Sequence, residues 1–188
     1  ENGTGKSTLA MLMCALEKPQ SGSVAIDGMD AFARKNRIKV RSHIGYVMQH
    51  PENQLFADTV ADDIAYGPAC LGLPSDEADR RVDEMLKLVG IEHLRQRSPW
   101  DLSGGERRLA AIAGVLANKP DIIVLDEPTV GLDTHAREHI LSILRKLHKE
   151  GATIVIITHS LHVAAGNAER VVLLHPGTGP GHSTDTDR

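Results

Sequence analysis

The chain opens with Glu1-Asn2-Gly3-Thr4-Gly5-Lys6-Ser7-Thr8, and this stretch decides the fold. It matches the end of the phosphate-binding loop (P-loop) pattern, in which a strand is followed by a glycine, four residues, Gly-Lys-Ser/Thr and a helix. We expect the first glycine of that pattern, and the strand, to stand upstream of residue 1. Glycines let the backbone curl so that its N–H groups point at phosphate oxygens. Residues 1–8 are therefore predicted to bind the phosphates of a nucleotide.

Two side chains of this stretch carry specific chemistry. Lys6 is expected to reach the β- and γ-phosphates, and the Ser7 hydroxyl to complete the ligand shell of a Mg²⁺ ion. A helix over residues 7–17 should follow, because its N-terminus favours the negative phosphate. Its apolar face would consist of Leu9, Met13 and Leu16. A glycine-rich turn that matches by chance is the alternative, and the motifs further along the chain count against it.

The composition is that of a globular chain and excludes several classes of function. Apolar residues make up 41% and charged residues 24% of the 188 residues, with a net charge of −4, so one domain with a real core is expected. The absence of a basic block argues against non-specific binding to nucleic acid. No apolar run approaches the ~18–20 residues that span a bilayer. Cys14 and Cys70 stand far apart, which is typical of a reducing compartment.

The first half of the chain reads as a short β-rich start followed by helices. Residues 22–28 are predicted to form a strand that ends in an Asp-Gly turn, and residues 44–48 a second strand. Residues 59–116 are mostly helical, with breaks at Gly67-Pro68 and at residues 72–74. Ser75 is expected to cap a helix that runs to Val89. The apolar positions of that helix are Val82, Met85, Leu86 and Val89.

The second half alternates strands and helices. The apolar run at residues 121–127 is typical of a buried parallel strand, and a helix over residues 134–149 should end at Gly151. A strand at 153–158, a short helix and a strand at 170–174 follow, and residues 175–188 read as a disordered tail. This order predicts an α/β fold with a parallel sheet and with ligands at the carboxyl ends of its strands.

Two acids close the apolar run at the end of its strand. Asp126 could hold Mg²⁺, and Glu127 could orient and deprotonate a water that attacks the γ-phosphate. The alternative is a solvated pair of acids that begins a turn at Pro128. The P-loop upstream in the same sheet favours the functional interpretation.

A glycine pair precedes another helix. In Leu102-Ser103-Gly104-Gly105-Glu106, Ser103 should cap a helix over residues 107–116, and the glycines let another backbone approach. Leu-Ser-Gly-Gly between a P-loop and an acid-terminated strand resembles the signature of the ATP-binding cassette (ABC) ATPases. Further positions resemble the family's Q-loop, D-loop and switch histidine; they are Gln49, Gly131-Leu132-Asp133 and His159. The resemblance covers the chain to about residue 174.

The resemblance assigns roles residue by residue. It implies ATP and Mg²⁺ as cofactors, and Glu127, His159 and Gln49 as the catalytic residues, with Glu127 as the base. The implied Mg²⁺ ligands are Ser7, Gln49 and Asp126. The implied nucleotide-binding residues are Glu1, Asn2, Gly3, Thr4, Gly5, Lys6, Ser7 and Thr8 of the P-loop, with Ser103, Gly104, Gly105, Glu106 and Asp133. The residue that stacks on adenine would lie upstream of residue 1.

A narrower resemblance concerns residues 49–74, 98–103 and 111–117, which look like the ATPases of cobalt importers and energy-coupling-factor (ECF) vitamin importers. It implies an ABC ATPase domain over residues 1–174 with a partial N-terminal β subdomain and a helical subdomain at roughly 53–118. It also implies a head-to-tail dimer with a second ABC ATPase, the same or paralogous. Further implied partners are a membrane scaffold protein and a substrate-capture membrane protein, at the cytoplasmic side of the cell membrane. The cargo would be a vitamin, or a cobalt or nickel ion.

The sequence departs from the usual ABC pattern at two positions, and two alternative functions are open. Glu106 replaces the more frequent glutamine of the signature, and Ser160 stands where many ABC ATPases carry aspartate. The alternatives are a non-transport ABC ATPase and an inactive truncated remnant. We expect the given residues alone to aggregate or to fold partly, because a missing central strand exposes two strand edges. Residues 49–74 are the candidate docking segment, with Glu52, Asp62 and Asp63 pairing with basic residues of a membrane partner.

Overall fold

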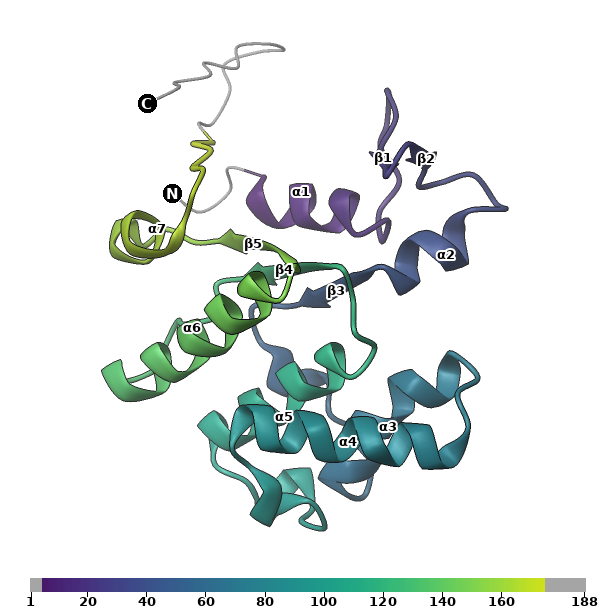
Figure 1. Ribbon diagram of the computed structural model, residues 1–188. Coiled ribbons are helices and arrows are strands. Elements are labelled where there is room, and N and C mark those ends of the chain that lie inside the picture. Colours follow the sequence, from purple (N-terminus) through teal and green to yellow (C-terminus); the bar gives the residue numbers. More distant parts are fainter. Residues whose placement is uncertain (1–4, 175–188) are drawn as a thin grey trace.

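A parallel sheet forms the centre of the computed structural model, which describes residues 5–174 (Figure 1). The strands are β3 (Ile44–Val47), β4 (Ile122–Asp126) and β5 (Thr153–Ile157), in the order β3-β4-β5. Val47 pairs with Leu125, and Asp126 pairs with Ile157. The carboxyl ends of the strands therefore share one edge of the sheet. The predicted α/β fold with a parallel core is confirmed.

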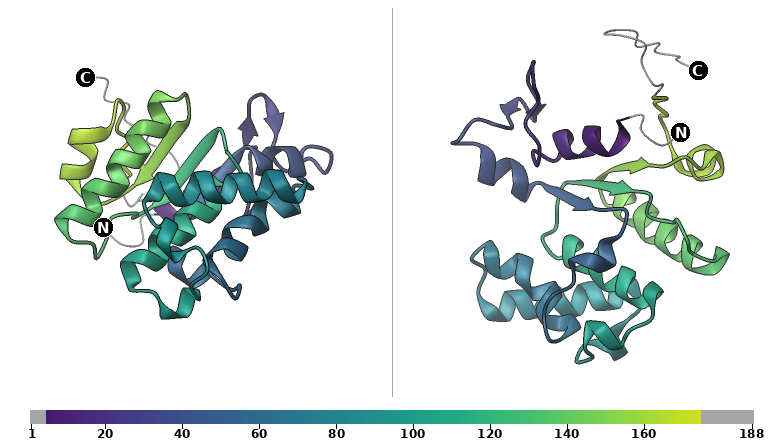
Figure 2. Two further views of the ribbon diagram at one scale, coloured as in Figure 1. Left: turned by 60° about the horizontal axis from the view of Figure 1, so that its bottom comes forward. Right: turned by 180° about the vertical axis from the view of Figure 1, so that it is seen from behind.

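Side chains of the central strand alternate between two hydrophobic clusters, as the period of a strand requires. Ile123 and Leu125 point into the larger cluster, which they share with helices α5 (Gly104–Leu116) and α6 (Thr134–Lys149). Val124 points to the other face, where it packs with Ala10 of helix α1 (Lys6–Met13). Figure 1 and the right view of Figure 2 show α1 on one side of the sheet, and α5 and α6 on the other.

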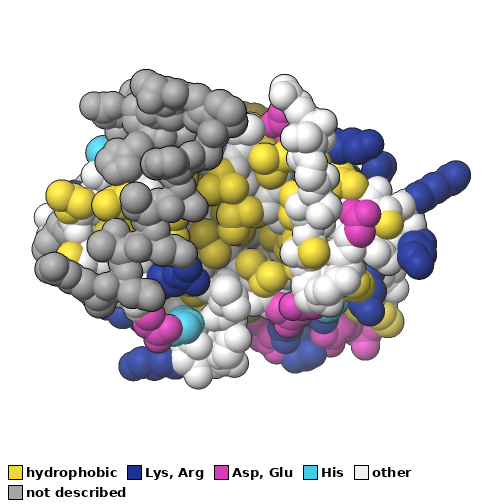
Figure 3. All heavy atoms as spheres, turned by 90° about the horizontal axis from the view of Figure 1, so that it is seen from above, with side chains coloured by type: hydrophobic (Ala, Val, Ile, Leu, Met, Phe, Trp, Pro, Cys, Tyr) yellow, Lys and Arg dark blue, Asp and Glu magenta, His cyan; other side chains and the backbone are white. Residues whose placement is uncertain are grey.

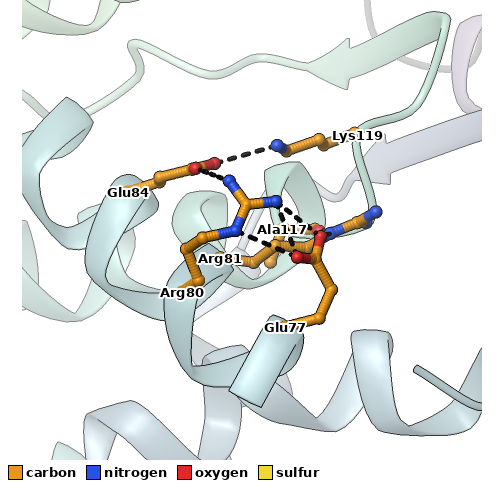
Figure 4. A network of polar contacts seen from close by, with 6 residues as sticks. All are labelled: Glu77, Arg80, Arg81, Glu84, Ala117 and Lys119. Carbon is orange, nitrogen blue, oxygen red and sulfur yellow. Dashed lines mark hydrogen bonds and ion pairs between the residues drawn. The ribbon is translucent and has the colours of Figure 1, made fainter. Parts of the chain in front are cut away.

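Three helices, α3 (Val60–Cys70), α4 (Ser75–Val89) and α5, pack into one group below the sheet. Polar contacts also fasten α4 to the end of α5 (Figure 4). Arg81 donates from Nη1 to the carbonyl of Ala117 over 3.1 Å and pairs with Glu77. Lys119 pairs with Glu84 at 2.9 Å, and Glu84 also pairs with Arg80. The group therefore has a shared apolar core and a polar clasp.

Shorter elements complete the described chain. They are β1 (Ala25–Ile26), β2 (Met29–Asp30), α2 (Arg37–Ser42), η1 (Pro51–Gln54), η2 (Glu92–Leu94), η3 (Pro99–Asp101) and α7 (Leu161–Asn167). Strands β1 and β2 form an antiparallel hairpin. Its turn is the predicted Asp27-Gly28 pair, with φ values of 49° and 74°, as a tight hairpin turn requires.

The first helix is shorter than predicted, and a different face of it is buried. It ends at Met13 instead of residue 17, and Leu9 and Leu16 are 40% and 51% exposed. Ala10 and Cys14 are buried instead, because small side chains let the helix lie close to the sheet. Burial raises the pKa of the Cys14 thiol to about 12. Seen from the α1 side, hydrophobic side chains gather in the middle of this face (Figure 3).

Other boundaries also differ from prediction. Gly67-Pro68 does not break α3: Pro68 stands in the last turn, so the hydrogen bond lost with its N–H lies close to the end of the helix. Gly67 lies against Asn118, whose Oδ1 would be 2.4 Å from an added Cβ. Ser75 is the first residue of α4 and not its cap, since Pro74 occupies the capping position. The predicted strand at 22–28 spans only β1.

The last predicted strand is wrong. Residues 170–174 form no strand, and Val172 and Leu173 are each 68% exposed. Within the described residues β5 pairs only with β4, so residues 170–174 do not extend the sheet at the other edge of β5. The predicted tail at 175–188 lies outside the described residues. The division into subdomains at residues 53–118 stays a prediction.

Candidate functional site

The predicted Mg²⁺ ligands Ser7 and Asp126 meet at the carboxyl edge of the sheet. Ser7 Oγ donates a 2.8 Å hydrogen bond to Asp126 Oδ2. Ser7 belongs to the first turn of α1, which begins directly after Gly5 at φ 81°, a conformation that favours glycine. Asp126 is the last residue of β4 and is 5% exposed. A hydroxyl and a carboxylate in contact are hard oxygen donors that fit Mg²⁺.

Tyr46 is a neighbour of Asp126 that the sequence analysis missed. It lies on β3 beside β4, in register with Val124. Burial raises the pKa of its hydroxyl to about 12, and the charge of Asp126 and a hydrogen bond to that carboxylate add to the shift. Tyr46 therefore stays protonated at neutral pH beside Asp126. A tyrosine in a strand gave no sequence signal for this contact.

Glu127 and His159 meet at the ends of neighbouring strands, where the sequence placed them. Glu127 Oε1 accepts a hydrogen bond from the His159 backbone N–H at 2.9 Å and lies 2.6 Å from His159 Nδ1. Thr158 Oγ1 donates to Glu127 Oε2 at 3.1 Å. The carboxylate is thus fixed by groups that follow β5, and Glu127 is only 7% exposed.

The backbone of Glu127 makes this contact possible. Its φ is 48°, in the left-handed region that non-glycine residues seldom adopt. The reversal turns the chain sharply after Asp126, while the Glu127 N–H still donates to the carbonyl of Ile157 at 2.9 Å. Asp126 and Glu127, adjacent in sequence, can therefore face different partners: Ser7 for one and His159 for the other.

Gln49 comes two residues after β3 and is exposed. Its backbone carbonyl accepts a 3.4 Å hydrogen bond from Nη2 of Arg108. Since Val47 pairs with Leu125, Gln49 belongs to the same edge of the sheet as Asp126 and Glu127. Arg108 was not among the predicted site residues, because nothing in its sequence context tells how far a long side chain reaches.

The Leu-Ser-Gly-Gly segment lies apart from the phosphate-binding stretch. Ser103 caps α5 in a reciprocal box with Glu106: the Ser103 N–H donates to Glu106 Oε2 at 2.8 Å, and Ser103 Oγ donates to the same oxygen at 2.6 Å. These hydrogen bonds hold the pKa of the Glu106 carboxyl below its ordinary value. A side chain added at Gly104 or Gly105 would meet no atom within 4 Å, so this surface is open.

The Leu-Ser-Gly-Gly segment lies apart from the predicted phosphate-binding residues Lys6 and Ser7 of its own chain. It begins α5, on the opposite side of the sheet from α1. The segment and helix α1, which carries Lys6 and Ser7, therefore lie on different sides of the sheet in one chain.

The remaining predicted residues fall into three groups. Lys6 is the first residue of α1, and Thr8 is exposed on the same helix. Asp133 caps α6 by accepting a 2.8 Å hydrogen bond from the Ala136 N–H. The third group lies outside the described residues and consists of Glu1, Asn2, Gly3 and Thr4.

The acids predicted to face a membrane partner are partly engaged within the chain. Asp63 is 8% exposed and accepts from the Phe56 and Ala57 N–H groups at 3.1 and 3.2 Å. The expectation that Asp63 docks a partner is wrong, because its carboxylate braces the loop before α3. Asp62 is exposed but accepts from Thr59 Oγ1 at 2.6 Å.

Within residues 5–174, no helix is both long and apolar enough to cross a bilayer. The same residues hold no cluster of three or more His, Cys, Asp or Glu side chains with metal-site geometry. A metal held by Ser7 and Asp126 would therefore need further ligands from phosphate or water, which is the usual manner in which Mg²⁺ binds.

Comparison with known proteins gives consistent results. Residues 1–130 match the ABC transporter family. A putative ABC transporter ATP-binding protein of Bifidobacterium longum is 50% identical over 185 residues, covering 91% of this chain and 24% of the relative. The energy-coupling factor transporter ATP-binding protein EcfA of Methanothermobacter thermautotrophicus is 46% identical, covering 94% of this chain and 57% of that protein.

Solved structures agree with these relatives. CbiO1 of Clostridium perfringens, part of the ABC transporter complex cbiONQ, superposes with a TM-score of 0.76 at 43% identity, covering 85% of this chain and 64% of that one. The dimeric ATP-binding cassette MJ0796, bound to ADP and Pi in a post-hydrolysis state, gives a TM-score of 0.77 at 33% identity, covering 87% and 74%. The chain thus spans less than two thirds of the curated relatives named above and of CbiO1.

Proposed function

We propose, from the premise that this chain belongs to the ABC transporter ATP-binding family, that it is the ATP-hydrolysing part of an ECF-type importer. Relatives named as energy-coupling factor ATP-binding proteins and the likeness to CbiO1 support this type. The cargo of the whole protein would be a vitamin or a transition-metal ion such as cobalt or nickel. The observation that carries the proposal is the pairing of Ser7 with Asp126, directly beside Glu127 and His159.

The chemistry follows from where these groups lie. Residues 1–8 would hold the phosphates of ATP, with Lys6 neutralising their charge. Ser7, Asp126 and Gln49 would hold Mg²⁺, which supplies charge stabilisation to the transferring phosphoryl group. Glu127 would accept the proton of the attacking water, and His159, in contact with Glu127 Oε1, would orient that carboxylate toward the γ-phosphate.

A second chain would complete each site. The Leu-Ser-Gly-Gly segment and α1 lie on opposite faces of the molecule, so Ser103, Gly104 and Gly105 of one chain would close over ATP held by another. The dimeric state of the MJ0796 structure supports this arrangement. The second ATPase would be an identical or a paralogous chain.

ATP hydrolysis by the purified full-length protein tests the proposed activity. We expect turnover that requires Mg²⁺ and that disappears in Lys6→Ala, because phosphate binding loses its lysine. The measurement is phosphate release with and without chelator. Lys87→Ala, which removes an exposed lysine of α4, serves as the control. Wild-type protein that binds no ATP would contradict the proposal and would favour an inactive remnant.

An exposed aromatic pair lies at the surface of the helical group. Phe56 and Tyr66 are 59% and 54% exposed and form a T-shaped pair with ring centroids 4.8 Å apart. Leu71 is 43% exposed on the same stretch of chain. Exposed aromatic side chains are enriched in interface cores. We infer that this pair, more than the acids nearby, receives a helix of the membrane scaffold protein.

Removal of the aromatic pair should uncouple the ATPase from its membrane partners. We expect full-length Phe56→Ala/Tyr66→Ala to lose most co-purification with the membrane proteins, since truncation of an aromatic anchor costs ~2 kcal/mol or more. Its own ATP turnover should stay within about twofold. Ile38→Ala, which removes an 82% exposed apolar side chain from α2, is the matched control. Equal recovery of the complex by both variants would refute this docking site.

A non-transport ABC ATPase remains the alternative function. The relatives named as transporter subunits favour transport. Uptake of a labelled vitamin or of cobalt or nickel ions by cells that carry or lack the full-length gene would separate the two, because only a transport ATPase changes accumulation of the cargo.

A further inference from the structure

One buried arginine connects the two loops that carry the predicted catalytic groups. Arg108 projects from α5 and is 6% exposed. Its Nη1 donates to the carbonyl of Val130 at 2.6 Å and, more weakly, to that of Pro128 at 3.4 Å. Its Nη2 donates to the carbonyl of Gln49 at 3.4 Å. Pro128 and Val130 belong to the loop that follows Glu127. A single guanidinium therefore binds this loop and the loop that carries Gln49.

We propose that Arg108 is a positioning residue that keeps the Gln49 loop and the loop after Glu127 in one mutual arrangement. The inference rests on the proposed ATPase function and adds to it a residue that touches neither ATP nor the reacting atoms. A group that orients water and a group that accepts its proton must act together, and a misplacement of ~1 Å can cost ~10²-fold in rate. Arg108 links the backbones that carry these groups.

The chemistry of arginine suits this task. A guanidinium is planar, stays charged and presents its donors in a rigid fork, so two donors can serve two carbonyls at a fixed spacing. A lysine ammonium is a compact point charge and does not offer that fork. Both loop segments are free of helix and strand structure at the bonded carbonyls of Gln49 and Val130. Their mutual position therefore depends on side-chain contacts of this kind.

A second group extends the link within the Gln49 loop. Glu52 Oε2 lies 3.6 Å from Arg108 Nε, and Glu52 Oε1 lies 3.3 Å from His50 Nδ1. Burial alone would raise the pKa of the Glu52 carboxyl. Its own backbone N–H, His50 and the charge of Arg108 outweigh that effect and lower the pKa. Glu52 is therefore a carboxylate at neutral pH and is held beside Arg108. The Glu52 carboxylate thus holds the Arg108 guanidinium at Nε, in addition to the carbonyls bound at Nη1 and Nη2.

The helix that carries Arg108 is itself fixed by packing within the helical group. Helix α5 shares one hydrophobic cluster with α3 and α4, and the contacts of Figure 4 clasp its C-terminal end to α4. Asp63 of α3 in turn holds the backbone of Phe56. Arg108 therefore belongs to the helix that packs both within the helical group and beside the two loops.

The test compares arginines that make similar contacts in different places. Arg108→Gln and Arg108→Lys are made in the full-length protein. The control is Arg81→Gln, which removes another carbonyl-bound arginine, on α4 and remote from the loops. We expect both Arg108 variants to lose ~10–10²-fold in kcat with KM for ATP within about twofold. Arg81→Gln should keep the wild-type kcat, even if its melting temperature falls as much as that of the Arg108 variants. Hydrogen exchange of residues 49–54 and 127–132 is measured without nucleotide.

Exchange in both segments should accelerate together in Arg108→Gln and in neither for Arg81→Gln. The proposal is overturned if kcat of Arg108→Gln matches the control, if Arg108→Lys restores full turnover, or if only one segment exchanges faster. Absence of hydrolysis by the wild-type protein would instead refute the proposed ATPase function. In that case the exchange data still decide whether Arg108 joins the two loops.

Discussion

Glu127→Gln is expected to lower ATP hydrolysis by ~10²–10⁴-fold, the usual loss when a general base is removed, while ATP still binds. Glutamine keeps the size of the side chain, and its oxygen can accept from the His159 N–H as Glu127 Oε1 does. Its amide can donate to Thr158 Oγ1, which contacts the other carboxylate oxygen in the native chain. The fold of the site should therefore survive, and ATP-bound closed dimers should accumulate.

Single-turnover hydrolysis and ATP binding, measured on the full-length protein, separate these effects. Glu138→Gln neutralises a half-exposed acid of α6 and should hydrolyse at the wild-type rate. If Glu127→Gln hydrolyses ATP at a near-normal rate, another group is the base. If it fails to bind ATP, the substitution has disturbed the site instead of the chemistry.

Ser103→Arg should abolish turnover when both chains of the dimer carry it. Arginine adds bulk and positive charge at the open surface beside Gly104 and Gly105, where the partner's nucleotide would sit. In a mixed dimer with one native chain, only one of the sites is blocked. Turnover per dimer should then fall by half or more, depending on how strongly the sites cooperate.

Ser103→Arg also removes the cap of helix α5, and this effect on stability must be distinguished from obstruction of the partner's nucleotide site. Ser103→Ala removes the hydroxyl that accepts from the Glu106 N–H, which costs ~1 kcal/mol of stability, but adds no bulk. We expect it to retain much more turnover than Ser103→Arg. Turnover by the Ser103→Arg homodimer equal to that of Ser103→Ala would show that this segment closes over no nucleotide.

The sequence predicted the elements that carry chemistry and missed those set by tertiary contact. The apolar run before Asp126, and the amphipathic pattern of α4 and α6, are local signals, and the structure places these elements where they were expected. Glu127 and His159 were each expected directly after a parallel strand, and such strands end at one edge of the sheet; the contact between the two side chains is a finding of the structure. The roles of these residues stay predictions.

What was missed depends on neighbours distant in sequence. Gly67-Pro68 reads as a break, but the close approach of Asn118 and the position of Pro68 in the last turn keep α3 whole. Asp63 reads as a surface acid, yet it is buried beneath backbone N–H groups of the preceding loop. Arg108 follows a recognisable motif, but only the folded chain shows that its fork reaches Gln49 and Val130.

The left-handed backbone at Glu127 has a consequence for how this protein tolerates sequence change. A side chain at φ 48° is strained by ~1–2 kcal/mol, and glycine would relieve that strain. Glycine would also remove the carboxylate that the His159 N–H and Thr158 Oγ1 contact, and an unpartnered buried donor costs ~1–3 kcal/mol. The same carboxylate thus keeps a strained backbone in place and carries the proposed chemistry, so a directed-evolution campaign on this chain should screen turnover as well as melting temperature in every round.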